Sequence, residues 1–267
     1  MTGLAVVGDR AWAEAWHRSW DRQQEAYAPD REARMAALVE VTEAVVGPAP
    51  VVVDLGCGPG SLTRRLLARL PGAEVVAVDR DPVLLAVARA SFAGDDRVRV
   101  VDLDVAGPGW VAGLGRDRID AVLACTVTHY LAEAGLRWLY ADCAGLLAPG
   151  GLLANADHMP LDHLPTVGAA LTDRQQAARA RCWAAGVPDW EAWWAEVERD
   201  PALADAASAR RDRPGVTRSA EWHPPAAWHR LALLDAGFRE AGVTHRWAHG
   251  ALVAARSGDC HPTTETR

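Results

Sequence analysis

Short apolar runs alternate with stretches of helical spacing along the first 160 residues of this 267-residue chain. The run at 51–53 consists of three valines, and β-branched residues of this kind favour buried strands. Leu62, Leu66, Leu67 and Leu70 follow at spacings that gather them on one face of a helix. The same reasoning predicts further strands over 74–79, 98–101, 119–124 and 152–156, and further helices over 82–92 and 131–147.

Residues 10–47 have the pattern of two further helices, separated by a break at 29–30. Asp30 stands where it can cap the second of them. In the first helix, tryptophans recur every fourth residue and therefore form a stripe along one face. This stripe can pack against the sheet, or it can be part of a lid that brings three side chains to a ligand: Trp16, Trp20 and Tyr27. The sequence leaves both interpretations open.

Glycines occupy every second position after the first predicted strand, in the sequence Asp54-Leu-Gly56-Cys57-Gly58-Pro-Gly60. A glycine turn between a strand and a helix lets a ligand approach the backbone, because no Cβ intervenes. The dinucleotide fingerprint requires a third glycine where this chain has Ser61, and a carboxylate at position 54 would repel a pyrophosphate. The stretch resembles the first motif of the class I S-adenosylmethionine-dependent methyltransferases.

The resemblance implies that the glycine loop curls around the methionine part of S-adenosylmethionine, with Asp54 near the ammonium group. Asp79 ends the second predicted strand, where an acid can accept both ribose hydroxyls. By resemblance Asp104, or alternatively Asp102, accepts the adenine amino group. The cofactor contacts expected in total are Asp54, Gly56, Cys57, Gly58, Gly60, Asp79, Arg80, Asp104, Val105, Cys125 and Tyr27.

Titratable side chains follow the fourth and fifth predicted strands, at the edge where open α/β sheets bind ligands. His129 is a candidate general base for a hydroxyl acceptor, because neutral imidazole can take a proton near physiological pH. It could equally be a helix-start histidine that is hydrogen-bonded to backbone. His158 is the second candidate base. A metal-dependent site of the catechol type would need an acid where Cys125 and Thr126 stand, so no metal is expected.

The segment 159–222 exceeds the minimal fold, and its pattern is helical with breaks at proline and glycine. Insertions at this point cap the substrate pocket in many small-molecule methyltransferases, although a surface hairpin or a dimer contact is an alternative. The substrate contacts expected from these caps are Trp16, Trp20, Tyr130, Trp193 and Trp194. The arginines at 210–213 are interpreted as a solvated helix end. A helix after 223–225, with Trp228, Leu231 and Leu234 facing inward, and strands over 239–247 and 251–256 complete the pattern.

Composition narrows the possible functions. The formal charge of −7, from 28 basic and 35 acidic residues, argues against nucleic-acid binding. No apolar run is long enough for a membrane span and no signal-type segment begins the chain, so a cytoplasmic protein is expected. Five cysteines without a C-x-x-C spacing argue against a disulfide framework or a zinc site. The lysine-free composition suggests a bacterial source with a GC-rich genome.

The resemblance covers about residues 50–157 and 224–256, including the L-x-P-G-G turn at 147–151 and D-A-G-F at 235–238. It implies an α/β fold with a doubly wound, seven-stranded, mostly parallel sheet. The expected division is a helical cap at 1–49, a cofactor-binding core at 50–158 and 223–257, a helical insertion over the substrate pocket at 159–222, and a flexible tail at 258–267.

The activity implied is methyl transfer from S-adenosylmethionine to an O or N nucleophile of a small, aromatic or apolar molecule of the natural-product type, by a monomer or homodimer. The apolar part of this hypothesis rests on the indole-rich caps. Two alternatives stay open: a non-methylating member of the fold, such as a cyclase or regulator, and a protein or RNA methyltransferase. The acidic charge and the lack of an N-P-P-Y-type sequence after the fourth strand disfavour nucleic-acid substrates.

Overall fold

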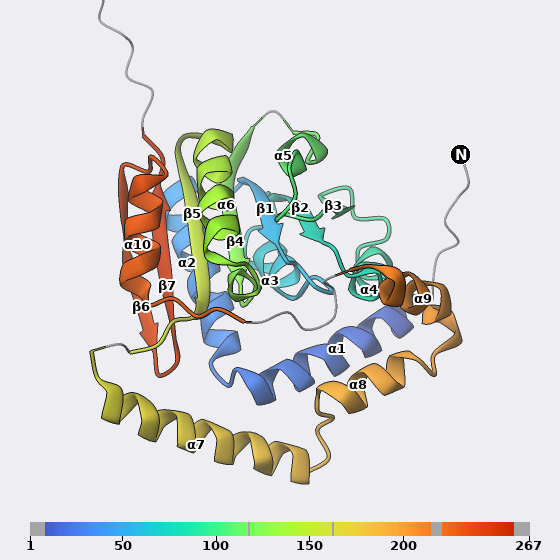
Figure 1. Cartoon of the computed structure of the whole chain (residues 1–267). Coiled ribbons are helices and arrows are strands. Elements are labelled where there is room, and N and C mark those ends of the chain that lie inside the picture. Colours follow the sequence, from blue (N-terminus) through green and yellow to red (C-terminus); the bar gives the residue numbers. More distant parts are fainter. Residues whose placement is uncertain (1–8, 117, 162, 215–220, 259–267) are drawn as a thin grey trace, which may run out of the picture.

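The computed structural model describes residues 9–116, 118–161, 163–214 and 221–258, and it contains one seven-stranded sheet with helices on both faces (Figure 1). The strand order is β3-β2-β1-β4-β5-β7-β6; β1 to β5 are parallel, and β7 is antiparallel to β5 and β6. The strands are β1 (Val51–Leu55), β2 (Glu74–Asp79), β3 (Val98–Asp102), β4 (Ile119–Cys125), β5 (Leu147–His158), β6 (Glu240–Trp247) and β7 (Gly250–Arg256). The predicted fold class is confirmed.

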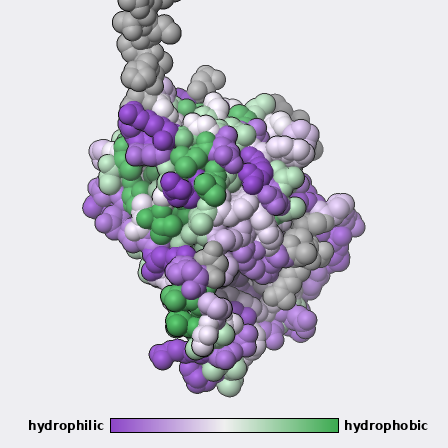
Figure 2. Space-filling view, turned by 60° about the vertical axis from the view of Figure 1, so that its left-hand side comes forward, coloured by the Kyte–Doolittle hydropathy of each residue, from purple (hydrophilic) through white to green (hydrophobic). Residues whose placement is uncertain are grey.

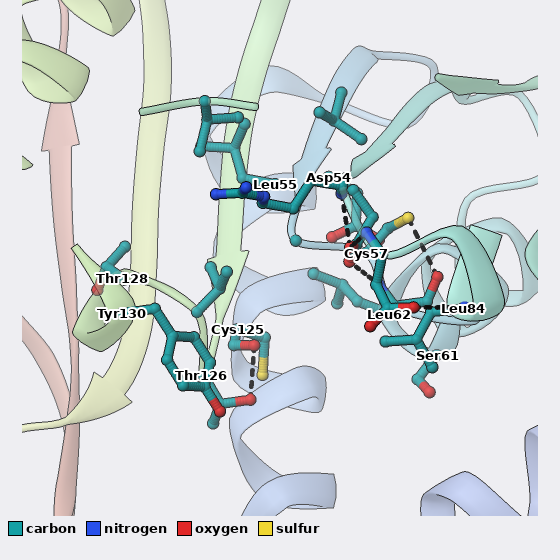
Figure 3. A pocket seen from close by; sticks show the side chains of 18 of the residues that line it. Asp54, Leu55, Cys57, Ser61, Leu62, Leu84, Cys125, Thr126, Thr128 and Tyr130 are labelled. Atoms are coloured by element: carbon teal, nitrogen blue, oxygen red, sulfur yellow. Dashed lines mark hydrogen bonds between the residues drawn. The ribbon is translucent and has the colours of Figure 1, made fainter. Parts of the chain in front are cut away.

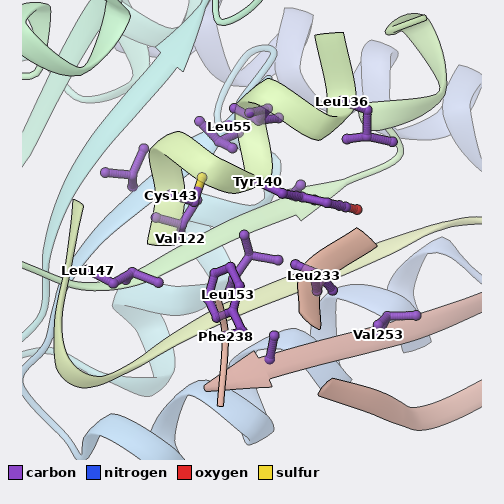
Figure 4. Close-up of a cluster of buried hydrophobic side chains, with 14 of the residues drawn as sticks. Leu55, Val122, Leu136, Tyr140, Cys143, Leu147, Leu153, Leu233, Phe238 and Val253 are labelled. Atoms are coloured by element: carbon purple, nitrogen blue, oxygen red, sulfur yellow. The ribbon is translucent and has the colours of Figure 1, made fainter. Parts of the chain in front are cut away.

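Successive side chains of the central strands point to opposite faces, and both faces are buried. In β1, Val53 and Leu55 join a cluster beneath α6 (Glu133–Leu146) and α10 (Ala226–Asp235), part of which Figure 4 shows. Val52 joins a second cluster, beneath α2 (Arg31–Val46) and α3 (Ser61–Arg69). Burial on both faces explains why the strands are nearly continuous apolar runs in the sequence.

The remaining helices lie around the carboxyl ends of the strands or at the sheet's first edge. In Figure 1, α1, α7 and α8 lie below those strand ends. A third hydrophobic cluster joins α1, α4, α8 and α9. The bounds are α1 (Arg10–Tyr27), α4 (Pro82–Ser91), α5 (Trp110–Gly113), η1 (Thr128–Tyr130), α7 (Pro165–Ala184), α8 (Trp190–Val197), η2 (Pro201–Leu203) and α9 (Ala204–Asp212).

The two predicted N-terminal helices form, but they have different roles. Met35 and Leu38 of α2 pack directly on the sheet, whereas α1 lies across α4 and α7. The side chain of Asp30 does not cap α2; it accepts a hydrogen bond from Nη2 of Arg34 at 3.0 Å instead. The division into caps and core stays a prediction, and the expected flexible tail lies outside the described residues from 259 onward.

One inward-facing prediction is wrong. Leu231 is 55% exposed, because the stripe of α10 that faces the sheet runs through Ala226, His229 and Leu233. Figure 2 shows hydrophobic patches separated by hydrophilic surface on one face of the molecule. No helix in the described ranges is long and apolar enough to cross a membrane. The expected monomer or homodimer stays a prediction.

Candidate functional site

Two cavities adjoin at the carboxyl ends of the parallel strands. The first has a volume of about 370 Å³ and is bounded by the glycine loop after β1, the end of β2 and the loop after β3. The second, of about 520 Å³, lies between η1, the end of β5 and one face of α7. Both volumes are in the range of small-ligand sites. The side chains that line both cavities are Gln24, Thr126, Tyr130 and Trp190.

The glycine loop of the first cavity needs glycine for steric reasons. Gly56, Gly58 and Gly60 have φ angles of 62°, 56° and 97°, in the left-handed region that other residues rarely adopt. A Cβ on Gly56 would lie 2.1 Å from Cγ2 of Val127, and one on Gly60 would lie 2.3 Å from Cε2 of Phe92. Gly56 and Gly58 line the cavity, whereas Gly60 packs against Phe92 behind it.

Asp54 and Asp79 place two carboxylates at this cavity. Oδ2 of Asp54 accepts hydrogen bonds from the hydroxyl and the backbone N–H of Thr63, at 2.7 and 3.2 Å. Oδ2 of Asp79 accepts the N–H of Gly58 at 2.8 Å, which ties the end of β2 to the glycine loop. Burial raises the pKa of Asp54 to about 7 and that of Asp79 to about 6.

The loop after β3 separates the two candidate adenine contacts. Asp104 and Val105 line the first cavity, and Oδ2 of Asp104 pairs with Nη1 of Arg80 at 2.9 Å. Asp102 is not among the lining residues and instead pairs with Arg213, whose Nη1 and Nη2 lie 2.7 and 3.1 Å from its two oxygens. The placement favours Asp104 over Asp102.

The expectation of a solvated helix end at 210–213 holds for Arg211, which is exposed, but it is wrong for Arg210 and Arg213. Nε of Arg210 lies 2.7 Å from Oδ2 of Asp81, and its guanidinium lies 3.5 Å from the ring centroid of Trp194. Arg213 binds Asp102 and the carbonyl of Arg80, while Nη2 of Arg80 donates to the carbonyl of Pro214 at 2.5 Å. We call Arg210, Arg213 and Pro214 the ionic strap; of these, Arg210 lines the first cavity.

The cap tryptophans divide into two groups. Trp20, Trp190 and Trp194 line the first cavity, and Trp190 also lines the second. The indole of Trp16 donates to Oδ2 of Asp200 at 2.7 Å and does not line either cavity. The indole of Trp193 is buried, lies 5.0 Å from that of Trp20 and donates to Ser19 Oγ at 3.1 Å. Trp16 and Trp193 therefore support the lining indoles from behind.

Figure 3 shows Cys125, Thr126 and Tyr130 at and just after the end of β4, across from Asp54 of β1, Cys57 of the glycine loop and Ser61 at the start of α3. Thr126 has a φ of 56°, which is unusual for a β-branched residue and marks local backbone strain. Such strain clusters at functional sites, and Thr126 stands where the two cavities meet.

His129 faces the second cavity from η1, held from behind by Asp157 of β5. Nδ1 of His129 lies 2.7 Å from Oδ1 of Asp157, and the backbone N–H of His129 donates to Oδ2 at 3.1 Å. Burial opposes protonation of the ring, but the carboxylate outweighs it and raises the pKa of His129. The sequence left open whether His129 is a candidate base or a helix-start histidine whose ring is bonded to backbone. In the structure the ring is bonded to the Asp157 carboxylate.

A buried polar network continues behind Asp157. The hydroxyl of Thr128 donates to Oδ2 of Asp157 at 2.7 Å and accepts from Nδ2 of Asn155 at 2.9 Å. Asn155 also donates to the hydroxyl of Tyr140, which lies 2.7 Å from Nδ1 of His229. The network fixes the Asp157 carboxylate and, through it, the orientation of the His129 ring.

Two more imidazoles lie beside His129. The ring centroids of His158 and His223 are 5.3 and 5.4 Å from that of His129. Burial lowers the pKa of His158 to about 3, so this ring is neutral at physiological pH and is a weaker proton acceptor than His129. Of the two candidate bases, His129 is the better placed.

Sequence comparison adds to this geometry. The family described as "Methyltransferase domain" matches residues 53–153. The trans-aconitate 2-methyltransferase of Sinorhizobium fredii is 30% identical over 226 residues, which are 82% of this chain and 76% of that protein. The chain belongs to the class I S-adenosylmethionine-dependent methyltransferases.

Other relatives match a shorter part of this methyltransferase. The trans-aconitate 2-methyltransferase of Acidovorax ebreus is 35% identical over 128 residues, or 45% of this chain and 43% of that protein. The chain spans about half the length, or less, of most of the curated relatives that it matches.

Two solved structures share the fold at low sequence identity. Human N-acetylserotonin methyltransferase in complex with S-adenosylmethionine has a TM-score of 0.55 at 18% identity, over 90% of this chain and 56% of that one. An O-methyltransferase family protein of Burkholderia thailandensis has a TM-score of 0.56 at 17% identity, over 93% and 70%. These likenesses concern the fold alone.

The first cavity of this methyltransferase has groups that match S-adenosylmethionine. Asp54 is a buried and Asp79 a half-buried carboxylate, both with raised pKa values, and a cation or hydroxyl donors beside them would favour their ionised forms. The expected cofactor residues that line it are Asp54, Gly56, Cys57, Gly58, Asp79, Arg80, Asp104, Val105 and Cys125. Tyr27 lines the second cavity instead. The individual contacts stay predictions.

Sequence reasoning missed several side chains of the methyltransferase's second cavity. Arg179, Gln175 and Thr172 come from α7, whose sequence has no motif, and His223 and Glu221 come from the segment before α10. The sequence signal for the α7 residues is their spacing: between 168 and 179 the lining positions follow one another after four, three and four residues, which places them on one helix face. Within the described ranges, no three His, Cys, Asp or Glu side chains are placed to hold a metal ion. The expectation of no metal stays a prediction.

Proposed function

We propose that this protein transfers the methyl group of S-adenosylmethionine to a carboxylate oxygen of a small organic acid. The observation that carries the proposal is the junction of the two cavities. The first has the glycine loop and the carboxylates of Asp54 and Asp79 that suit the cofactor, and it meets a polar second cavity at Thr126 and Tyr130. The relatives named above are trans-aconitate 2-methyltransferases, which supports an acid as the acceptor.

The residues of the first cavity hold the donor in this proposal. Asp54 lies near the ammonium group, Asp79 accepts the ribose hydroxyls, and Asp104 accepts the adenine amino group. The bound cofactor supplies a methyl group that its sulfonium already activates. The protein therefore mainly has to position the acceptor in line with that methyl group and to exclude water. Trp20, Trp190 and Trp194 contribute the apolar walls that exclude it.

The second cavity holds the acceptor. A carboxylate oxygen already carries the electron pair that attacks the methyl carbon, so no base has to remove a proton. His129 then acts in its protonated form, with the ring edge opposite Asp157 donating to the acid. The Asp157 carboxylate stabilises that form and keeps the ring oriented. Tyr130, which lines both cavities, lies between donor and acceptor.

One observation favours a second candidate function. A histidine backed by a buried carboxylate is also the arrangement of a general base, as in hydrolases that activate a hydroxyl. In this alternative the acceptor is an alcohol or phenol, and neutral His129 takes its proton. The two candidates predict opposite effects of pH on the methylation rate.

The aromatic or apolar acceptor expected from the indole-rich caps has weaker support. Of the cap tryptophans, Trp190 lines the second cavity, whereas Trp20 and Trp194 line the first and Trp16 and Trp193 line neither. The other two alternatives, a non-methylating cofactor binder and a protein or RNA methyltransferase, are distinguished by the experiment below.

The test uses methyl-labelled S-adenosylmethionine with a panel of organic acids, including trans-aconitate, and a panel of alcohols and phenols. We expect label in the acids. Asp79→Asn should weaken cofactor binding and transfer together, whereas the matched variant Asp205→Asn, on the exposed side of α9, should change neither. Label in the alcohols or phenols supports the second candidate. Label in protein or RNA, or cofactor binding without transfer to any acceptor, contradicts both.

A further inference from the structure

The face of α7 that borders the second cavity is polar. In this helix, which the structure describes in full, none of the 20 residues is buried. Gly168, Thr172, Gln175 and Arg179 recur at helical spacing and line the cavity. A helix that covers a site for an apolar molecule would present an apolar stripe there. Here a hydroxyl, an amide and a guanidinium face the ligand space, which suits a polar or anionic group.

Arg179 is held in position by Tyr27 at the end of α1. The guanidinium lies 4.7 Å from the ring centroid of Tyr27, and Nη2 donates to the Tyr27 carbonyl at 3.4 Å. Gln175 donates to the same carbonyl at 2.8 Å, and the hydroxyl of Tyr27 accepts the N–H of Trp190 at 3.0 Å. The arginine is therefore ordered before a ligand arrives, so little side-chain entropy is lost on binding.

The charge of Arg179 has no counterion among the described residues. Its Nε is shielded from solvent and has no hydrogen-bond partner there. Other part-buried arginines of the caps do pair with acids: Arg31 with Asp21 at 2.7 Å and Arg210 with Asp81 at 2.7 Å. A shielded donor without a partner is costly, and the planar guanidinium matches a carboxylate with two parallel hydrogen bonds.

The other charged groups of the cavity do not neutralise this arginine. Among the described residues that line the second cavity, Glu221 is the one with a carboxylate, and its Oε2 lies 3.2 Å from Nε2 of His223. Apart from two tyrosines, the remaining titratable lining residues are histidines, and His129 is the one that Asp157 favours in its protonated form. Arg179 and His129 together therefore suit a molecule with two negative charges.

We propose that Arg179, with Gln175 and Thr172 beside it, binds a second carboxylate of the acceptor. The carboxylate that receives the methyl group lies at His129 and Tyr130, on a different wall of the same cavity. The preferred substrate is therefore a small di- or polycarboxylic acid, and the product is its monomethyl ester. This inference rests on the proposed function, and it adds the group that selects the acid.

The test measures binding, so that it does not depend on turnover. Glutaconate and crotonate are unsaturated acids that differ by one carboxylate; each is titrated by calorimetry into the protein saturated with S-adenosylhomocysteine. We expect the wild type to bind glutaconate about tenfold to a hundredfold more tightly than crotonate, since a charged hydrogen-bonded pair contributes about 1.5–3 kcal/mol. Arg179→Gln should abolish this preference, and Arg179→Lys should retain part of it.

Arg174→Gln is the matched control, because Arg174 is an exposed arginine of the same helix and does not line the cavity. It should keep the wild-type preference. Unchanged S-adenosylhomocysteine affinity in every variant shows that the fold is intact. A wild type without preference for the diacid, or a preference that survives in Arg179→Gln, overturns the inference. Methyl transfer to either acid is assayed separately, so failure of the proposed function is seen independently of failure of the Arg179 site.

Discussion

Nδ1 of His129 lies 2.7 Å from Oδ1 of Asp157, and both side chains are buried where β4 and β5 reach the second cavity. His129 lies in η1, directly after β4, and Asp157 lies near the end of β5; the carboxyl ends of these neighbouring parallel strands meet at one edge of the sheet. This pair sets the protonation state of the group that faces the acceptor, so its response to pH distinguishes the two candidate chemistries.

The rate of acid methylation should fall with rising pH. The pKa of His129 is raised, and the protonated ring holds the acid in the proposed function, so kcat/KM decreases as pH rises through that pKa. Asp157→Asn removes the charge that favours the imidazolium, which should shift the fall to lower pH and reduce kcat/KM about tenfold to a hundredfold near neutral pH. Rates from about pH 6 to pH 9 check this. A rate that rises with pH identifies His129 as a base instead.

Asp54 should lower the folding stability of the cofactor-free protein, and the loss should depend on pH. The folded-state pKa of Asp54, about 7, exceeds the ordinary aspartate pKa of 3.8, so the folded protein binds more protons than the unfolded chain, and its stability falls as pH rises between these values. Asn at this position can still accept both hydrogen bonds from Thr63. Asp54→Asn should therefore raise the Tm by an amount that grows up to about pH 7, while it weakens S-adenosylmethionine binding about tenfold or more. An unchanged Tm at pH 8 contradicts this account.

The ionic strap should slow cofactor release. Arg80, Asp81, Asp104 and Arg210 line the first cavity, and Arg213 ties the strap to Asp102. Arg213→Ala should increase the dissociation rate of S-adenosylhomocysteine several-fold, and high salt should do the same in the wild type. The free energy of unfolding should change by less than about 1 kcal/mol, since these pairs are partly exposed.

Arg211→Ala is the control for the strap. Arg211 pairs with Glu198 at 2.6 Å on the exposed side of α9 and does not line the first cavity. Its removal should leave the dissociation rate unchanged in stopped-flow measurements. Equal rates for the wild type and Arg213→Ala would show that the strap does not control release.

The strain at Thr126 should appear as a difference between two substitutions. Both Thr126→Ala and Thr126→Gly remove the hydroxyl that donates to the Cys125 carbonyl at 2.6 Å. Glycine tolerates the φ of 56°, whereas alanine does not, so Thr126→Gly should be more stable than Thr126→Ala by about 1 kcal/mol. Denaturant unfolding of the two variants measures this; equal stabilities would mean that position 126 is not strained.

The sequence predicted the parts of the structure that depend on local pattern. The three valines at 51–53 indicated a strand, and the structure buries both faces of β1. Gly56 was noticed because glycines alternate there, and the structure shows that a Cβ at this position would meet Val127. The acids Asp54 and Asp79 were found because they sit at fixed distances from those glycines. These features lie in one strand-turn-helix-strand unit, from β1 to the end of β2, in which segments close in sequence are also close in space.

The parts that depend on packing between distant segments were not predictable. The stripe of Trp12, Trp16 and Trp20 has the same spacing whether it meets a ligand or other indoles, and only tertiary contacts place Trp20 at the cavity while Asp200 binds the other two. The Arg179 side chain is positioned by contacts with Tyr27, which lies 152 residues earlier in the chain. No local pattern records such a pairing.

The most direct test of the central claim is the chemical nature of the methylated product. A methyl ester releases its methyl group as methanol in mild alkali, whereas a methyl ether does not. After incubation with methyl-labelled S-adenosylmethionine and trans-aconitate, the account predicts a labelled small molecule that loses its label as volatile methanol on alkaline treatment. A labelled product that keeps its label in alkali, or absence of label in the acid while an alcohol or phenol is methylated, would contradict it.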